Sequence, residues 1–181
     1  MDGNDDIEIV QLTRPNEAGP AIRRAMTDCW IAVTNAGGAA GFPFPPVDAG
    51  HVAPAVDALV ARLDPRLCRI LLARNDGALA GWVVLSREDG RLLGHIGFVN
   101  HLQAHPGLQR RGVGSSLMRA LRGVARDEMG LEQVHLAARG GVGLEHFYGG
   151  LGWREIGRWP NKLRIAPGDT REEILMILAP L

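Results

Sequence analysis

Alternating and continuous apolar runs along the chain predict seven strands. Residues 7–12 (IEIVQL) alternate apolar and polar side chains, as a half-buried strand does. Residues 67–73 and 78–85 are rich in Leu, Ile and Val, and Asn75-Asp76-Gly77 between them is typical of a hairpin turn. The remaining strands are predicted at residues 91–104, 131–138, 153–159 and 172–179.

Apolar residues spaced by three and four positions predict helices between these strands. The predicted helices cover residues 16–35, 48–64, 112–127 and 143–150. The first is expected to end at Gly37-Gly38. Asp48 is a plausible N-cap for the second, and Asp64-Pro65 would stop it.

The order of these elements, β-α-α-β-β-β-α-β-α-β-β, predicts an α/β (α+β) protein with a mostly antiparallel sheet. A βαβ crossover through residues 91–138 would bring two strands together in parallel. The chain has 181 residues, of which 46% are hydrophobic. That length and composition fit one globular domain with a sizeable core.

Charge narrows the range of functions. Twenty basic residues balance twenty acidic ones, which argues against a nucleic-acid partner and against polybasic attachment to a membrane. Lys162 is the only lysine and does not follow a Gly-rich loop, so the chain has no P-loop for nucleotide phosphates. Schiff-base chemistry would have to use the same residue.

The two cysteines and the first residues point to a reduced compartment. Cys29 and Cys68 lie far apart in apolar surroundings, so both are expected in the core. The acidic start, Met1 to Asp6, is unlike a signal peptide, and no apolar run approaches the roughly 18 residues of a membrane span. We therefore expect a cytoplasmic protein.

One stretch, Leu102 to Ser115, combines the features of an anion site. A strand ends at a Pro-Gly turn, and Gln109-Arg110-Arg111-Gly112-Val113-Gly114 then opens an amphipathic helix. The first N–H groups of a helix lack internal partners, so they can bind a phosphate. A dinucleotide fingerprint would need Gly at 117, where Leu117 stands. The equivalent pattern from Gly141 fails at His146.

The pattern Q/R-x-x-G-x-G/A, which residues 109–114 match in full, resembles the GCN5-related N-acetyltransferase (GNAT) superfamily. Two flanking stretches support the resemblance: Leu102-x-Ala104-x-Pro106 upstream and residues 146–153 (HFYGGLGW) downstream. It is strongest over residues 80–160. The resemblance implies about seven strands splayed between strands 4 and 5 and about four flanking helices. It also implies a single N-acetyltransferase domain over 1–181, with an acetyl-CoA-binding core at about 91–153.

The resemblance also assigns roles to residues. Main-chain groups of Leu102, Gln103 and Ala104 would pair with the pantetheine arm of acetyl-CoA, and Tyr148 would be the general acid for the leaving thiolate. A main-chain N–H near Gln103 would stabilise the developing oxyanion. The residues implied to bind the cofactor at the helix start are Gln109, Arg110, Arg111, Gly112, Val113, Gly114 and Ser115.

Two departures from the family leave the general base open. Gly141 stands where many members carry a CoA-contacting Asn, and Phe98 stands where many carry a catalytic Glu. Asn100 shares the face of Phe98 by strand alternation and could hold a relaying water. His101 is a second candidate because of its ordinary pKa near 6.5. Other histidines that could serve are His95, His105 and His146, and no metal site is predicted among them.

The acceptor side carries a more distant resemblance. Residues 35–42, together with 157–160 and 167–169, are similar to tabtoxin-resistance-type small-molecule acetyltransferases. That similarity implies a small primary amine as acceptor: a toxin, an antibiotic or an amino-acid-like metabolite. Arg164 and Asp169 could then bind its carboxylate and ammonium groups. The side chains expected to line the acceptor pocket, unless they serve core or dimer packing, are Trp30, Phe42, Phe44, Trp159 and Arg164.

Three other functions stay open from the sequence. The chain could bind acyl-CoA as a sensor without catalysis, it could acetylate protein N-termini or lysines, or it could bind another phosphate ligand at the same helix start. The partner expected first is a small-molecule amine. The family resemblance also implies a possible homodimer, since members commonly pair through their C-terminal strands and the stretch from Ile174 to Leu178 is apolar enough to do so.

Overall fold

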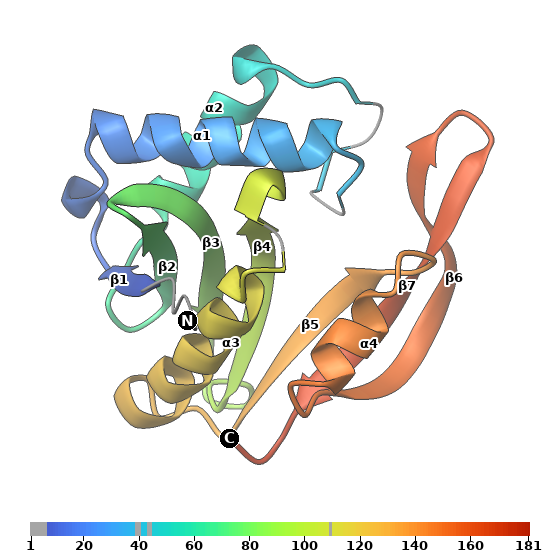
Figure 1. Ribbon diagram of the computed structural model, residues 1–181. Coiled ribbons are helices and arrows are strands. Elements are labelled where there is room, and N and C mark those ends of the chain that lie inside the picture. Colours follow the sequence, from blue (N-terminus) through green and yellow to red (C-terminus); the bar gives the residue numbers. More distant parts are fainter. Residues whose placement is uncertain (1–6, 39–40, 43–44, 109) are drawn as a thin grey trace, which may run out of the picture.

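The computed structural model describes residues 7–38, 41–42, 45–108 and 110–181, and its centre is one seven-stranded sheet (Figure 1). The strand order is β1-β2-β3-β4-β5-β7-β6. The strands are β1 (Glu8–Leu12), β2 (Cys68–Asn75), β3 (Ala78–Arg87), β4 (Ile96–Ala104), β5 (Gln133–Arg139), β6 (Arg154–Ala166) and β7 (Asp169–Leu178). All neighbours are antiparallel except β4 and β5. The predicted mixed, mostly antiparallel α/β fold is confirmed.

Helices cover both faces of the sheet and divide the core in two. They are α1 (Pro20–Asn35), α2 (Ala49–Ala61), α3 (Val113–Gly123) and α4 (Leu144–Gly149). One cluster of buried side chains joins α1 and α2 to one face of β2 and β3. The other joins α3 to the opposite face and continues under α4 to β5 and β7. We call these the α1 face and the α3 face.

Local sequence accounts for the turns that were predicted. Asp76 and Gly77 both have positive φ, 50° and 77°, in the turn between β2 and β3, and Asp and Gly tolerate that conformation best. Asp48 caps α2 by accepting the His51 backbone N–H at 3.2 Å. Both elements depend on residues a few positions apart, which is why the sequence reveals them.

The parallel pair β4 and β5 is short and then diverges. Its ladder runs from Ile96 opposite Gln133 to Val99 opposite Leu136. Both strands continue further, β4 to Ala104 and β5 to Arg139, without pairing to each other. The predicted splay between strands 4 and 5 is therefore present.

Several element boundaries differ from the prediction. The strand predicted from residue 91 begins at Ile96, because 91–95 form turns. The helix predicted from residue 16 begins at Pro20 after a short 3-10 turn, and the one predicted to 64 ends at Ala61. The helix predicted over 112–127 ends as α3 and continues as a π-helical turn, Val124–Glu128.

The largest difference lies at the C-terminal hairpin. Strands predicted at 153–159 and 172–179 extend to Ala166 and back to Asp169, and they form a long arm that projects from the sheet (Figure 1). Its outer part is exposed on both faces, so its sequence lacks the apolar alternation on which strand prediction depends.

Both cysteines are buried and unpaired, as expected. Burial raises the pKa of the Cys29 thiol to about 12 and also raises the pKa of Cys68. Neither thiol is therefore a nucleophile at neutral pH. None of the helices in the described ranges is long and apolar enough to cross a membrane.

Candidate active site

The free edge of β4 beyond Val99 is the first part of the site. Leu102 and Ala104 pack against the core on the α3 face. Asn100 pairs with Val84, a residue of the α1-face core, so its side chain points to the α1 face. A bulge at His101, with φ +52°, shifts the register with β3. Since β5 has diverged here, main-chain groups on this edge are free to pair with an extended ligand.

The start of α3 is the second part. Its N-cap, Gly112, has φ +82°, and the Ser116 N–H bonds the Gly112 carbonyl at 2.8 Å. The N–H groups of Val113, Gly114 and Ser115 therefore have no acceptor within the helix. The Val113 side chain is buried, so this residue presents only its backbone. The arrangement is an anion-binding helix start.

Nearby residues explain the glycines and the charge. A Cβ on Gly114 would approach the Phe147 ring to 3.2 Å, so glycine lets α3 and α4 pack closely. Arg110 and Arg111 are exposed beside the helix start. Gln109 lies outside the described residues. The sequence-predicted cofactor residues that are described thus lie along β4 and the start of α3, in consecutive parts of the chain.

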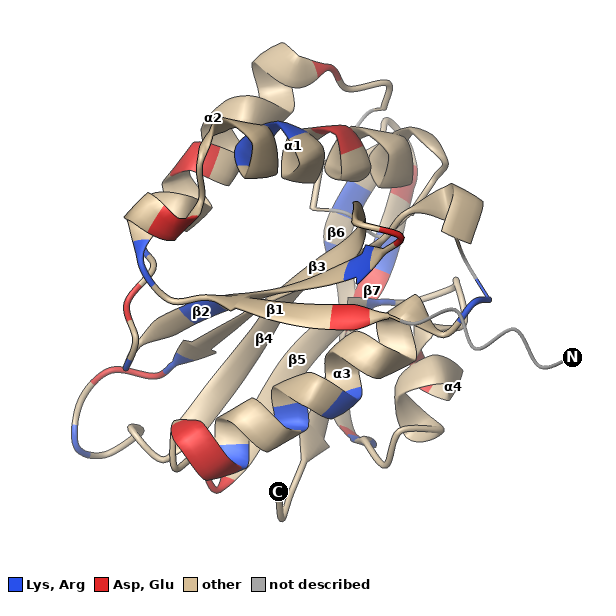
Figure 2. Ribbon diagram, turned by 60° about the vertical axis from the view of Figure 1, so that its left-hand side comes forward, with Lys and Arg blue, Asp and Glu red and all other residues tan. Residues whose placement is uncertain are grey.

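Positive charge continues along the outer side of α3. Arg119, Arg122 and Arg126 are exposed at helical spacing on α3 and the π-helical turn after it. Figure 2 shows this row of basic residues along α3. Arg126 pairs with Asp127 at 2.7 Å, so the positive charge that attracts anions here comes mainly from Arg119 and Arg122, and it does so most strongly at low salt.

Tyr148 is the third part of the site. Its ring is 7% exposed and packs against Phe147 and Trp153, with ring centroids 5.0 and 5.9 Å away. Its hydroxyl makes no hydrogen bond with any described residue, yet it is not among the fully buried polar atoms. Burial raises the pKa of Tyr148 to about 12, so the phenol keeps its proton at neutral pH.

An aromatic cluster lies on the α1 face next to the bulge. Trp30 is central: Phe42 and His101 lie 4.9 Å from it and Trp82 lies 5.1 Å from it, between ring centroids. Burial, and to a lesser extent the charge of Arg62, lowers the pKa of His101. The imidazole is therefore neutral at pH 7 and can accept a proton.

Other residues predicted for the acceptor pocket do not join this cluster. Trp159 is 55% exposed on the β6–β7 arm, where it stacks with Lys162 at 3.8 Å. Arg164 is exposed on the same arm. Asp169 pairs with Arg171 at 2.7 Å, so its carboxylate is already engaged. Phe44 lies outside the described residues.

Two polar side chains near the divergence of β4 and β5 received no role from the sequence, although the main chain of Gln103 did. The Gln103 side chain is fully buried, and neither of its amide atoms has a hydrogen-bond partner within the described chain. Arg139, the last residue of β5, donates from Nη2 to the Gly37 carbonyl at 2.7 Å. The alternation of residues 133–139 could have shown that Arg139 points away from the buried face. It could not have identified the Gly37 carbonyl as its partner, because Gly37 is 102 residues away in the sequence.

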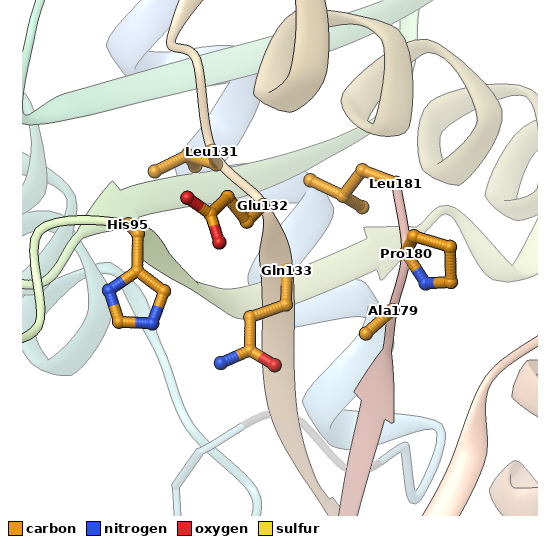
Figure 3. A pocket seen from close by; sticks show the side chains of 7 residues that line it. All are labelled: His95, Leu131, Glu132, Gln133, Ala179, Pro180 and Leu181. Carbon is orange, nitrogen blue, oxygen red and sulfur yellow. The ribbon is translucent and has the colours of Figure 1, made fainter.

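A separate hollow of about 490 Å³ lies at the opposite end of the sheet. Figure 3 shows that its lining comes from the turn before β4, the start of β5 and the C-terminus. The lining residues are His95, Leu131, Glu132, Gln133, Ala179, Pro180 and Leu181. It lies where β4 and β5 are still paired, so it is not part of the site described above.

Solved structures share this architecture at low sequence identity. A GCN5-related N-acetyltransferase from Kribbella flavida has a TM-score of 0.75 at 16% identity, covering 97% of this chain and 98% of that one. YncA from Salmonella typhimurium, solved with its cofactor acetyl-CoA, has a TM-score of 0.69 at 16% identity over 94% and 93% of the two chains. The ribosomal-protein-S18-alanine N-acetyltransferase from Escherichia coli has a TM-score of 0.69 at 16% identity over 96% and 94%.

Family membership comes from the sequence as well. No curated protein matches the chain significantly. Residues 23–153, in contrast, match the family model described as the acetyltransferase (GNAT) family, and this range contains the free edge of β4, the start of α3 and Tyr148. Such enzymes take their acetyl group from acetyl-CoA. The chain therefore belongs to the GNAT family and is an acetyl-CoA-dependent N-acetyltransferase.

Proposed function

We propose that the enzyme transfers the acetyl group directly to a primary amine of a small molecule. The donor side of this proposal rests on the end of the β4–β5 ladder at Val99 and Leu136, beside the αL-capped start of α3. A free strand edge and a helix start together suit a ligand that has an amide-rich arm and a diphosphate, as coenzyme A has.

The residues present fit acetyl-CoA. Main-chain groups of Leu102, Gln103 and Ala104 would pair with its pantetheine arm. The N–H groups from Val113 to Ser115 would bind the pyrophosphate, because they have no acceptor within α3. Arg110 and Arg111 add charge there. Gly112 has no atom within 4 Å of the place a Cβ would take, so its role is conformational: it supplies the αL cap.

Bound acetyl-CoA supplies a thioester acetyl group, and the chain supplies proton transfer and orientation. The Tyr148 hydroxyl, which is protonated at neutral pH, would donate to the sulfur of the leaving thiol. The amine must lose a proton, and the neutral His101 imidazole or a water held by Asn100 would take it. No covalent enzyme intermediate is needed, since holding both reactants side by side supplies the entropic advantage.

A small acceptor is favoured over a folded protein by the contacts of the loop after α1. The Arg139–Gly37 hydrogen bond ties the loop after α1 to the end of β5. Phe42, which belongs to that loop, packs against Trp30, and Trp30 packs against His101. Gly37 and Phe42 are thus held at the end of β5 and near His101, which favours a compact acceptor at that place. Toxins, antibiotics and amino-acid-like metabolites are the acceptor classes that we propose.

A free-thiol assay against an amine panel tests this function. Acetyl-CoA should raise the melting temperature of the protein, and at least one small amine should release free coenzyme A. Binding without thiol release from any amine would indicate a sensor. Release only with peptide N-termini or lysines would indicate a protein acetyltransferase.

A matched pair of variants tests the helix start. Gly112→Ala and Gly168→Ala both place a side chain at a positive φ with no neighbour within 4 Å, at +82° and +77°. Both should lose about 1–2 kcal/mol of stability. Only Gly112→Ala should raise the KM for acetyl-CoA, and an equal KM in both variants would contradict the assignment of this helix start.

A further inference from the structure

Arg139 occupies a position from which it can reach an acceptor. The β4–β5 ladder ends at Val99 opposite Leu136. Arg139 lies three residues beyond Leu136, at the end of the part of β5 that no longer pairs with β4. Ala138 is buried on the α3 face, so Arg139 points to the α1 face. Figure 1 shows the end of β5 between the C-terminal end of α1 and the β6–β7 arm.

The guanidinium of Arg139 is half-buried and incompletely bonded. Nη2 donates to the Gly37 carbonyl at 2.7 Å, which holds one edge of the group in place. Nε is fully buried and has no hydrogen-bond partner among the described residues. Arg139 also makes no ion pair within the described chain, although Glu173 is its cross-strand neighbour.

Neighbouring arginines form ion pairs, whereas Arg139 forms none within the described chain and is only partly compensated by the more distant carboxylate of Asp169. Arg171 pairs with Asp169 at 2.7 Å, and Arg158 pairs with both Glu155 and Glu172. Burial, followed by the charge of Arg171, lowers the pKa of Arg139. An arginine nevertheless keeps its charge at neutral pH. A cation held in this way gains most from a bound anion, because a buried charge is costly unless it is paired.

We propose that Arg139 binds a carboxylate of the acceptor, so that the substrates are primary amines that also carry a carboxylate, such as amino acids and their derivatives. This inference rests on the proposed function. The Gly37 carbonyl orients the guanidinium by accepting from Nη2, and the acceptor carboxylate would bind the Nη1 edge, for which no hydrogen bond within the described chain is present. A carboxylate accepts from guanidinium donors in short, charge-assisted hydrogen bonds. Its amine would then lie toward the divergence of β4 and β5, where the acetyl group is expected.

Matched acceptors test this assignment. The free-thiol assay compares L-amino acids with their carboxamides, which have the same side chain and amine but no carboxylate. Because the amine pKa differs within a pair, the useful quantity is the ratio of variant to wild-type KM for each compound. Arg139→Gln should raise that ratio about 10- to 100-fold for the carboxylates and leave it near 1 for the carboxamides. Arg154→Gln, an exposed arginine at the start of β6, should change neither.

A purely structural role predicts another outcome. If Arg139 only anchors the loop through Gly37, Arg139→Gln will impair both members of each pair equally, which overturns the proposal. A second measurement covers a variant that does not fold. With coenzyme A present, N-acetyl-L-amino acids should raise the melting temperature of the wild-type enzyme more than their carboxamides do. Equal shifts would also overturn the proposal.

Different results would overturn the role of Arg139 and the proposed small-molecule function. A wild-type enzyme that acetylates only amines without a carboxylate overturns the role of Arg139 and leaves the proposed small-molecule function intact. A wild-type enzyme that binds acetyl-CoA but releases no thiol with any amine overturns both.

Discussion

Removing the Tyr148 hydroxyl by Tyr148→Phe separates catalysis from folding in this enzyme. The hydroxyl makes no hydrogen bond with a described residue, and the buried ring is kept. The free energy of unfolding at pH 7 should therefore change by no more than about 0.5 kcal/mol. As a contrast, Thr27→Val removes a buried hydroxyl that does bond the Arg23 carbonyl, at 2.9 Å. That variant should lose about 1 kcal/mol of stability and keep its kcat.

The kinetic effect of Tyr148→Phe should be moderate. A general acid contributes about 10²- to 10⁴-fold to a rate. A leaving thiol with a pKa near 8.5 needs less help than an alcohol or an amine. We therefore expect kcat to fall about 10- to 100-fold while the KM for acetyl-CoA stays unchanged. The free-thiol assay measures both values.

The pKa of about 12 for Tyr148 adds a second measurement. The ordinary tyrosine pKa is 10.0, so between pH 10 and 12 the unfolded chain loses this proton before the folded chain does. Burial penalises only the phenolate, so the free energy of unfolding is unaffected by this group below pH 10 and falls as pH rises to about 12, by about 3 kcal/mol in total for two pKa units. Since pH 11 lies midway between the two pKa values, denaturant titrations at pH 7 and pH 11 should show wild type losing about half of this amount relative to Tyr148→Phe.

Two results would refute this account of Tyr148. An unchanged kcat in the folded variant would mean that the hydroxyl does not serve the leaving thiol. A wild-type kcat that falls from pH 8 to pH 9 because of an ionisation absent from Tyr148→Phe would mean that the phenol titrates far below the value its burial implies.

Three further predictions concern the general base, the β4 edge and the bonds of Arg69 on β2. If His101 is the base, kcat/KM should fall only below pH 6.5, since burial lowers the pKa of His101. His101→Gln should then remove this fall at acid pH. An identical pH profile in the variant would leave the water held by Asn100 as the base. In Gly81→Ala, the new Cβ would lie 2.4 Å from the Gln103 carbonyl oxygen. Thermal melts should therefore show that the protein loses about 1–3 kcal/mol of stability, and titration should show weaker acetyl-CoA binding. Gly157→Ala, whose Cβ would have no neighbour within 4 Å, is the control. Arg69→Gln breaks bonds to the Pro65 carbonyl at 3.0 Å and to a glutamate carboxylate, and it should cost about 1–3 kcal/mol in denaturant titration without changing KM.

Elements defined by neighbouring residues could be predicted, and elements defined by exposure could not. The hairpin at Asp76-Gly77 and the cap at Asp48 follow from a few adjacent side chains. The β6–β7 arm was underestimated because it contacts little core and so needs no apolar alternation. The start of β4 was placed too early because residues 91–95 form turns despite their apolar content.

In the candidate site, too, residues close together in the sequence could be predicted, whereas residues from distant segments could not. The helix-start motif is contiguous, so residues 110–115 were identified as a unit before the fold was known. Acceptor residues come from distant segments, and here the sequence grouped Trp30 and Phe42 with Trp159 and Arg164, which lie on the exposed arm. Arg139 was not selected at all, because a lone arginine at a strand end has no distinctive pattern until its surroundings are known.

By itself, the sequence determined the order of the elements, the glycine-capped helix start and the family, because each depends on hydrogen bonds and packing among residues close together in the chain. Only the tertiary structure decided where β4 and β5 separate, which face His101 takes at its bulge, and that Arg139 meets Gly37 from 102 residues away. Those features depend on strand register and on packing between segments, and these are set by the balance of contacts across the whole core.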